Sequence, residues 1–169
     1  MERINFRTDI LPLKNKLFRL ALRITLDSAE AEDIVQETMI RVWEKQEDLL
    51  QVESVEAYCL TICRNLALDK QALKASQTVE LNEALHDKPG HSSPHEDLVN
   101  NEKLAIVKRL FDELPIQQRE VIHLRDIEGN SYKEIASLLN LTEEQVKVNL
   151  FRARQKIRER FKHIENYGL

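Results

Sequence analysis

Apolar residues in the first part of the chain recur at the three- and four-residue spacing of amphipathic helices. The first apolar face consists of Leu13, Leu17, Leu20 and Ile24. A second helix is predicted from Asp27 and Ser28, which can cap its start, to about Glu44. Its apolar face consists of Ala31, Ile34, Val35, Thr38, Val42 and Trp43. This pattern favours a core position for Trp43, and an interface anchor is the alternative.

A third helix is predicted from Val55 to about Leu73, with Ser54 as its cap. Its inward side chains are expected to be Val55, Tyr58, Ile62 and Leu66. Cys59 and Cys63 lie one turn apart in this helix, and we interpret them as small buried or half-buried side chains rather than as metal ligands or a redox pair. Three helices of this length can share one small core, so residues 1–75 are expected to form a domain.

The helical pattern stops over residues 76–98, which contain two prolines, one glycine and three serines. Five acidic side chains and one basic side chain lie within 76–101. This composition predicts a flexible acidic linker over 76–100, followed by a second domain over 101–169. Both a simple tether and an acidic mimic of nucleic acid are compatible with such a linker.

Helical periodicity resumes after the linker, at Leu104, Val107, Leu110, Phe111 and Leu114. Pro115 can end that helix and begin the next, which is expected over about 117–126 and is closed by Gly129. Capping boxes at 131–134 and 142–145 then open two further helices. No strand pattern of useful length appears. The predicted fold is therefore all-α, with two small helical domains joined by a flexible linker, and the C-terminal one is a helix-turn-helix.

A helix-turn-helix presents the first turns of its second helix to the major groove of DNA. The net charge of −4 does not favour nucleic acid, but residues 147–162 carry seven basic side chains against one acid. Such a local basic strip is what phosphate binding requires. Side chains of this helix that can contact phosphates or base edges are Thr142, Gln145, Lys147, Asn149, Arg152 and Arg154.

Several classes of protein are not indicated by the sequence. The chain is 42% hydrophobic and 32% charged and has no apolar run long enough to span a membrane. Its first residues lack the apolar core of a secretory signal, so a cytoplasmic location is expected. There is no glycine-rich phosphate loop, GxSxG or HExxH motif, so neither catalysis nor a cofactor is expected. The linker contains three histidines, His86, His91 and His95, but no cysteine or ordered element accompanies them, so a metal site is not expected.

Three stretches resemble the extracytoplasmic-function (ECF) group of bacterial RNA polymerase sigma factors. AEDIVQETMIRVWEK (31–45) is similar to their polymerase-binding helix, and VEAYCLTICRNLALDK (55–70) is similar to their −10-element helix. Residues 114–161 resemble their −35-element domain. The chain departs from the common pattern at Val148 and Asn149, where the family often has serine and arginine, and at Tyr58, where it often has tryptophan.

The resemblance implies a sigma factor, which binds core RNA polymerase, recognises the −10 and −35 promoter elements and promotes DNA opening. The side chains it assigns to polymerase binding are Asp33, Gln36, Glu37 and Arg41. Those it assigns to the −10 element are Gln51, Arg64, Asn65 and Lys70. An anti-sigma factor is also an expected partner, while no small-molecule substrate is. Because affinity is divided between two tethered domains, the free protein is expected to bind DNA weakly.

Two alternatives remain open from the residues themselves. A stand-alone helix-turn-helix regulator would use 1–75 for dimerisation or sensing and would bind a palindromic operator without polymerase. A protein-binding adaptor would use the helical faces and would show no salt-dependent DNA binding. The polar helix faces are also compatible with ordinary solvated surfaces that carry pairs such as Glu37–Arg41.

Overall fold

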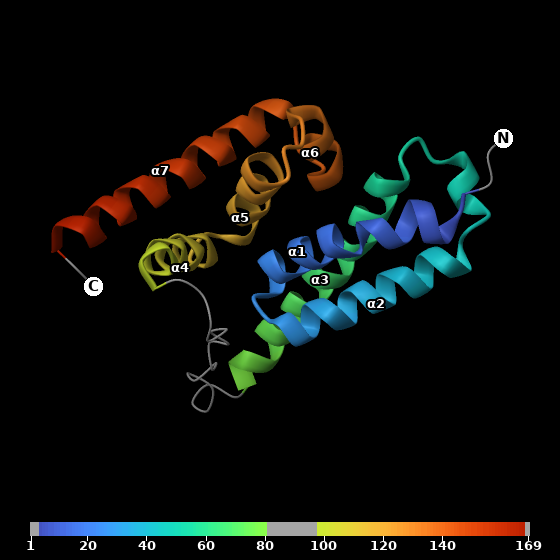
Figure 1. The fold of residues 1–169 in the computed structure, drawn as a ribbon, viewed down its shortest axis with the longest axis horizontal. Coiled ribbons are helices and arrows are strands. Elements are labelled where there is room, and N and C mark those ends of the chain that lie inside the picture. Colours follow the sequence, from blue (N-terminus) through green and yellow to red (C-terminus); the bar gives the residue numbers. More distant parts are fainter. Residues whose placement is uncertain (1–3, 81–97, 168–169) are drawn as a thin grey trace.

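The computed structural model describes residues 4–80 and 98–167 of the chain, and over these residues the secondary structure is helical, with no strand. Two helical domains lie against each other (Figure 1). The elements of the first are η1 (Phe6–Ile10), η2 (Leu11–Leu13), α1 (Lys14–Thr25), α2 (Ser28–Glu44), η3 (Asp48–Gln51) and α3 (Val55–Glu80). Those of the second are α4 (Leu98–Asp112), α5 (Ile116–Ile122), η4 (His123–Ile127), α6 (Tyr132–Leu139) and α7 (Glu143–Tyr167).

In the first domain, α1, α2 and α3 pack against one another around a shared apolar core. The sharp turn between α1 and α2 is made by Leu26, whose φ of 57° ends α1 in the left-handed region, and by Asp27, which caps α2. The Asp27 carboxylate accepts hydrogen bonds from the backbone N–H groups of Ala29 and Glu30 at 3.0 and 3.2 Å. The cap predicted from the sequence is therefore present.

The third helix is longer than expected. α3 ends at Glu80 rather than near Leu73, so residues 76–80, predicted as linker, are helical. The physical reason is that the chain from Lys74 to Glu80 contains neither glycine nor proline, and nothing local stops the helix. The remainder of the predicted linker, 81–97, lies outside the described residues, as do its three histidines.

The buried face of α3 is centred on different residues from those predicted. Its fully buried side chains are Cys59, Leu60, Cys63 and Ala67. The predicted ones, Val55, Tyr58, Ile62 and Leu66, flank this face and are only partly buried against the core. Small side chains occupy the centre because α1 crosses α3 there, and the Cys63 thiol donates a hydrogen bond to the backbone carbonyl of Leu17 in α1 at 3.4 Å.

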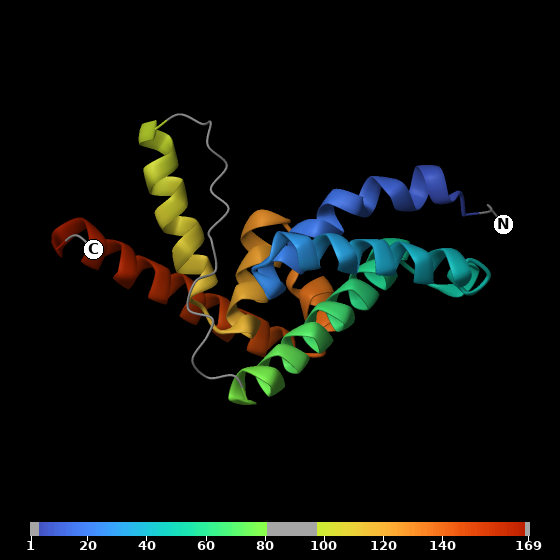
Figure 2. The ribbon, with the colours of Figure 1, turned by 90° about the horizontal axis from the view of Figure 1, so that it is seen from below.

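In the second domain, α6 and α7 form the predicted helix-turn-helix. Ser131 and Glu134 satisfy each other's backbone N–H groups in a capping box at the start of α6. Asn140, with φ of 55°, ends α6 and lets the chain turn directly into α7. Figure 2 shows α7 running on from this turn past α5 and α4.

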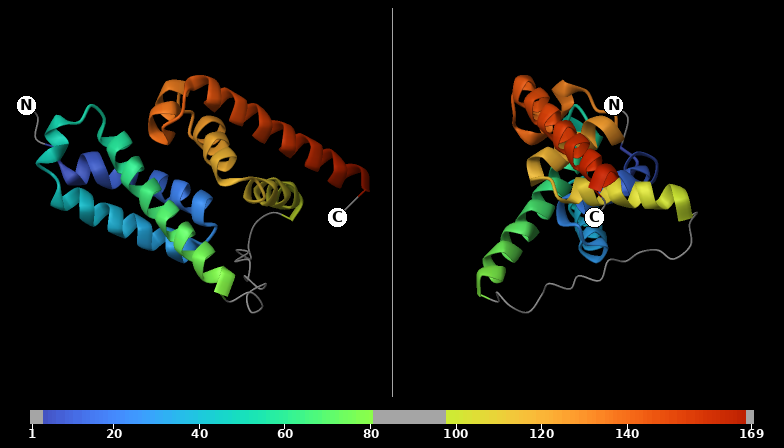
Figure 3. Two further views of the ribbon diagram at one scale, coloured as in Figure 1. Left: turned by 180° about the vertical axis from the view of Figure 1, so that it is seen from behind. Right: turned by 90° about the vertical axis from the view of Figure 1, so that its left-hand side faces the viewer.

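The two domains meet through α1 and α3 on one side and α5, η4 and α6 on the other. The far end of α7 extends away from the first domain (Figure 3). The contact is rich in charged side chains, and Arg119, Glu120 and His123 are buried there or beside it. Burial of charge requires partners, and these partners determine which side chains stay available for binding.

Candidate nucleic-acid and protein interfaces

The outer face of α2 is a continuous polar surface. Ala31, Ile34, Val35, Thr38 and Val42 are buried on the inner side. On the outer side Asp33, Gln36, Glu37 and Arg41 are all exposed, at helical spacing. The Arg41 guanidinium donates to the Glu37 carboxylate at 3.1 Å, and the Asp33 carboxylate lies 4.0 Å from the Lys70 ammonium of α3. The structure thus brings the predicted polymerase-binding residues together on one surface.

This surface ends in two exposed apolar side chains, of which Ile40 was not predicted. Ile40 is 53% exposed and Trp43 is 58% exposed, so the expectation that Trp43 is a core residue was wrong. Val42 is fully buried, and its neighbour Trp43 points about 100° away around the helix, where only the edge of the Phe6 ring meets it at 5.1 Å. Exposed aromatic side chains beside polar ones are typical of protein-binding surfaces.

Side chains predicted to contact the −10 element are divided between the surface and the interior. Gln51 in η3 and Asn65 in α3 are exposed, and Lys70 is partly exposed beside Asp33. Arg64, however, points into the domain contact, where its guanidinium pairs with the Glu120 carboxylate of α5. The Arg64 side chain is 17% exposed and that of Glu120 is 2% exposed. In this arrangement Arg64 is therefore ion-paired with a carboxylate of the protein itself.

Three further arginines make contacts between the two domains. Arg19 donates two hydrogen bonds to Glu128, at 2.6 and 3.1 Å. Arg23 lies 3.8 Å from the Asp112 carboxylate. In the opposite direction, Arg119 of α5 donates to the backbone carbonyl of Ile24 at 3.2 Å. Forked guanidinium–carboxylate contacts fix orientation as well as distance, so the contact between the domains is specific.

The start of α7 uses two predicted DNA-binding residues for its own cap. The Thr142 hydroxyl accepts from the Gln145 N–H at 3.1 Å, and the Gln145 amide oxygen accepts from the Thr142 N–H at 2.9 Å. Asn149 is partly buried and donates to the Gln145 backbone carbonyl at 2.9 Å. Arg154 is held by the Asp126 carboxylate through two hydrogen bonds.

The remaining exposed face of α7 combines basic and apolar side chains. Arg152 is exposed, and the exposed Lys147 lies 3.9 Å from Glu144, with its ammonium 5.5 Å from the Tyr132 ring centroid. Between them lie Val148 and Phe151, which are 45% and 67% exposed. The sequence singled out Val148 only as a departure from the family pattern and did not single out Phe151, although neither lies at a spacing that the buried face of the helix requires.

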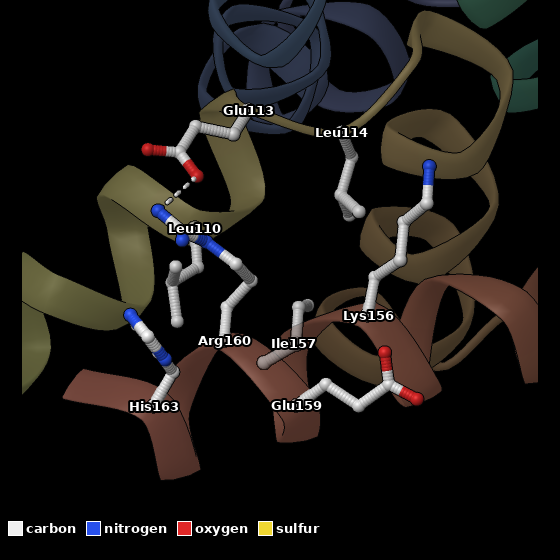
Figure 4. Close-up of a pocket in the computed structure, with 8 residues that line it drawn as sticks. All are labelled: Leu110, Glu113, Leu114, Lys156, Ile157, Glu159, Arg160 and His163. Atoms are coloured by element: carbon white, nitrogen blue, oxygen red, sulfur yellow. Dashed lines mark ion pairs between the residues drawn. The ribbon is translucent and has the colours of Figure 1, made fainter. Parts of the chain in front are cut away.

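Two hollows lie beside these surfaces. One, of about 440 Å³, lies between α4 and α7 over Leu110, Leu114 and Ile157, and an Arg160–Glu113 ion pair of 3.5 Å crosses its rim (Figure 4). A larger one, of about 720 Å³, lies between the start of α3 and α6, and Tyr58 lines it. Both combine apolar side chains with charged ones at their rims.

Within 4–80 and 98–167 no group of three or more histidine, cysteine or acidic side chains is arranged to hold a metal ion. No helix in the same part of the chain is long and apolar enough to cross a membrane. Cys59 and Cys63 are free, fully buried thiols, as predicted. Burial raises the pKa of Cys59 to about 11 and that of Cys63 to about 12, so both are protonated at neutral pH.

Comparison with known proteins gives matches to both domains. Residues 10–76 match the family model described as Sigma-70 region 2, and residues 104–157 match Sigma-70, region 4. The ECF RNA polymerase sigma factor SigL of Mycobacterium tuberculosis is 32% identical over 143 residues, which cover 84% of this chain and 80% of SigL. RfaY of Xanthomonas campestris, named as an RNA polymerase sigma factor, is 32% identical over 86% of this chain, which spans only 37% of RfaY.

Two solved structures have the same fold. The sigma factor RpoE from Bartonella quintana, solved with the anti-sigma factor NepR, has a TM-score of 0.77 at 24% identity, covering 93% of this chain and 96% of that chain. CnrH, solved with the cytosolic domain of CnrY, has a TM-score of 0.67 at 22% identity, covering 93% and 87%. The arrangement of helices is therefore shared.

Proposed function

Because this chain belongs to the ECF group of RNA polymerase sigma factors, which direct core RNA polymerase to promoters, we propose that it does so through the outer face of α2, the exposed side of α3 and the start of α7. Sigma factors are regulators rather than catalysts, and the polymerase carries out the chemistry. The cytoplasm, where polymerase and chromosome meet, is the proposed location. The observation that carries this assignment is the presence of both sigma regions in register in one chain.

The outer face of α2 is the proposed polymerase-binding surface. Its polar centre, Asp33, Gln36, Glu37 and Arg41, offers charge-assisted hydrogen bonds to a partner helix. Ile40 and Trp43 at its end add apolar area that water covers in the free chain. A polar face with an aromatic anchor is a usual composition for a protein–protein hot spot.

The proposed −10 surface consists of Gln51 in η3 with Asn65 and Lys70 on α3, joined by Arg64 once the domains separate. In the packed arrangement Glu120 takes the place that a DNA phosphate would take against Arg64. An arginine cannot bind both groups in a bidentate manner at once. The free protein is thus a closed form, and polymerase, by holding the two domains apart, releases Arg64.

The proposed −35 surface is the start of α7. Lys147 and Arg152 supply phosphate contacts, while Thr142 and Gln145, besides capping the helix, lie exposed at its first turn, where they can meet the DNA backbone. Asn149 donates to the Gln145 backbone carbonyl, and Arg154 is bound to Asp126. Asp126 must therefore release Arg154 before that side chain can reach DNA.

An anti-sigma factor is the proposed regulatory partner. RpoE from Bartonella quintana was solved with NepR, and CnrH was solved with a domain of CnrY. A partner of this class would act on the present chain by holding the closed form or by covering the α2 face. Either action removes a surface that transcription initiation requires.

Run-off transcription tests the proposal. Core RNA polymerase is supplied with genomic promoter fragments, with and without this protein, and new discrete transcripts are expected only when the protein is present. The double variant Asp33→Ala, Gln36→Ala should lose at least tenfold of this activity, because both side chains are exposed and the fold does not depend on them. Asn15→Ala, an exposed change on α1, is the matched control and should retain activity.

The opposite outcome would identify the stand-alone regulator. In that case no protein-dependent transcript appears, and the protein alone binds a palindromic duplex tightly. An adaptor would give neither transcripts nor salt-dependent DNA binding. Each of these results excludes the sigma-factor mechanism.

A further inference from the structure

The side of α7 that points away from the protein core is apolar at its centre. Val146, Leu150 and Ala153 are buried and hold the helix on its domain. Val148 and Phe151 lie on the opposite side, 45% and 67% exposed, and neither belongs to the hydrophobic core. A phenyl ring exposed to this extent gains little of the free energy that burial would provide, so its apolar surface is available to a partner.

The polar side chains around this pair are already engaged. Thr142 and Gln145 bind each other's backbone N–H groups, Asn149 donates to a backbone carbonyl, and Arg154 is held by Asp126. Few hydrogen-bonding groups at the start of α7 are therefore free to read base edges. Two of the side chains that remain exposed there, Val148 and Phe151, are apolar.

The apolar pair is placed where a recognition helix meets base edges. Lys147 and Arg152 flank it with exposed cationic side chains that can fix the helix on the phosphates. Residues three apart on a helix have Cβ atoms about 5–6 Å apart. Successive base pairs are about 3.4 Å apart, so Val148 and Phe151 can reach neighbouring or next-neighbouring pairs.

The apolar group that DNA presents in the major groove is the C5-methyl of thymine. We propose that Val148 and Phe151 form a specificity pair that reads thymine methyl groups within the −35 element, so this sigma factor requires thymine at one or two positions there. The inference rests on the proposed function and names the base that its −35 surface selects. Arg152 and Lys147 contribute affinity without this discrimination.

Replacement of thymine by deoxyuridine tests the pair, because deoxyuridine keeps every base-pairing group and lacks only the methyl. The reconstituted holoenzyme is first used to select a duplex from a pool of random duplexes. The selected duplex is then synthesised again in several versions, each with one −35 thymine replaced by deoxyuridine. Loss of one methyl contact should weaken holoenzyme binding about fourfold, the factor that corresponds to ~0.8 kcal/mol for one buried methyl-sized group. Replacement of the other thymines should leave holoenzyme binding unchanged.

The variant Val148→Ala, Phe151→Ala should bind thymine and deoxyuridine duplexes equally. Arg152→Ala should weaken binding to both by the same factor while keeping the fourfold preference. Tyr167→Ala, at a 78% exposed aromatic position at the far end of α7, is the matched control and should change neither value.

Equal binding of all thymine and deoxyuridine duplexes by the wild-type holoenzyme would overturn the inference, as would a preference that survives in the double alanine variant. In both cases the holoenzyme still selects a promoter, and the proposed function stands. If the holoenzyme retains no duplex above core polymerase alone, the proposed function fails and the inference fails with it.

Discussion

Arg64 of α3 and Glu120 of α5, 56 residues apart in sequence, form an ion pair across the contact between the two domains. Glu120 is almost completely buried, and burial raises the pKa of its carboxyl, while the hydrogen bond from Arg64 lowers it. The pair joins a side chain of the proposed −10 surface to a helix of the −35 domain. Whatever separates the domains therefore also frees Arg64.

Glu120→Gln should loosen the closed form. Loss of one member of a buried ion pair costs about 3–5 kcal/mol, and about 2–3 kcal/mol is expected here because Arg64 keeps some contact with water. The variant should unfold at lower urea concentration, or its domains should separate, which small-angle scattering detects as a larger radius of gyration.

Glu37→Gln provides the control for that change. Glu37 pairs with Arg41 on α2, but both side chains are about half exposed. Exposed pairs contribute less than about 1 kcal/mol, so urea unfolding and scattering should remain close to wild type. A Glu120→Gln protein as compact and as stable as Glu37→Gln would show that the buried pair does not hold the domains together.

His123 should make the closed form sensitive to mild acid. Burial and the charge of Arg23 lower its pKa to about 4, against an ordinary value of 6.5, and Glu128 lies 3.4 Å from its Nε2. The closed form therefore holds His123 neutral, whereas the unfolded chain takes up a proton below about pH 6.5. Stability should be complete above that pH and should fall as the pH falls toward 4, by about 2 kcal/mol at pH 5.

The measurement is urea unfolding at pH 7 and pH 5 for wild type, His123→Asn and His163→Asn. Burial raises the pKa values of Glu120 and Asp112, which acts in the opposite direction as the pH falls. The difference between wild type and His123→Asn isolates the histidine. His163 is exposed, and its variant should follow the wild type. An identical loss in all three proteins would contradict the assignment to His123.

Cys59 and Cys63 should not react in the native protein. With pKa values of about 11 and 12, both raised by burial, fewer than about one thiol in a hundred is ionised at pH 8, and access is blocked as well. Thiol labelling should proceed only as fast as the first domain opens, whereas the urea-unfolded chain should react at once. Asn15→Cys supplies an exposed thiol for comparison. Rapid labelling of native wild type would show that this core opens readily.

Thr142→Ala should lower the free energy of unfolding by about 1 kcal/mol, because the hydroxyl caps α7. Thr142→Ser retains the hydroxyl and should retain the stability. Urea unfolding of the isolated variants separates this effect from DNA binding. If Thr142→Ala is as stable as wild type and loses only promoter affinity, its role is contact with DNA rather than capping.

The helices could be predicted from local signals in the sequence, whereas the long-range partners of their side chains could not. The caps at Asp27, Ser131 and Thr142 depend on residues two or three positions away, so their patterns are visible in the sequence. Arg64 and Arg154 were identified from the sequence as polar positions of their helices, but their carboxylate partners lie 56 and 28 residues away. No periodicity indicates such pairs.

The error at Trp43 has a different cause. Hydrophobicity placed it in the core beside Val42, but its direction, about 100° from that of Val42 around the helix, lies beyond the edge of the buried face. The smaller side chain took the buried position, and the larger one remained available for a partner. A large apolar residue beyond the edge of the buried face of a helix is therefore better interpreted as a candidate contact.

The distance between the two domains tests the account most directly. Fluorophores attached at Asn15→Cys on α1 and Lys162→Cys on α7, both exposed positions, report that distance by energy transfer while the native cysteines stay unreactive. We expect high transfer in the free protein, low transfer after core RNA polymerase is added, and an already reduced value in free Glu120→Gln. Equal transfer with and without polymerase, in a holoenzyme that initiates transcription, would contradict it.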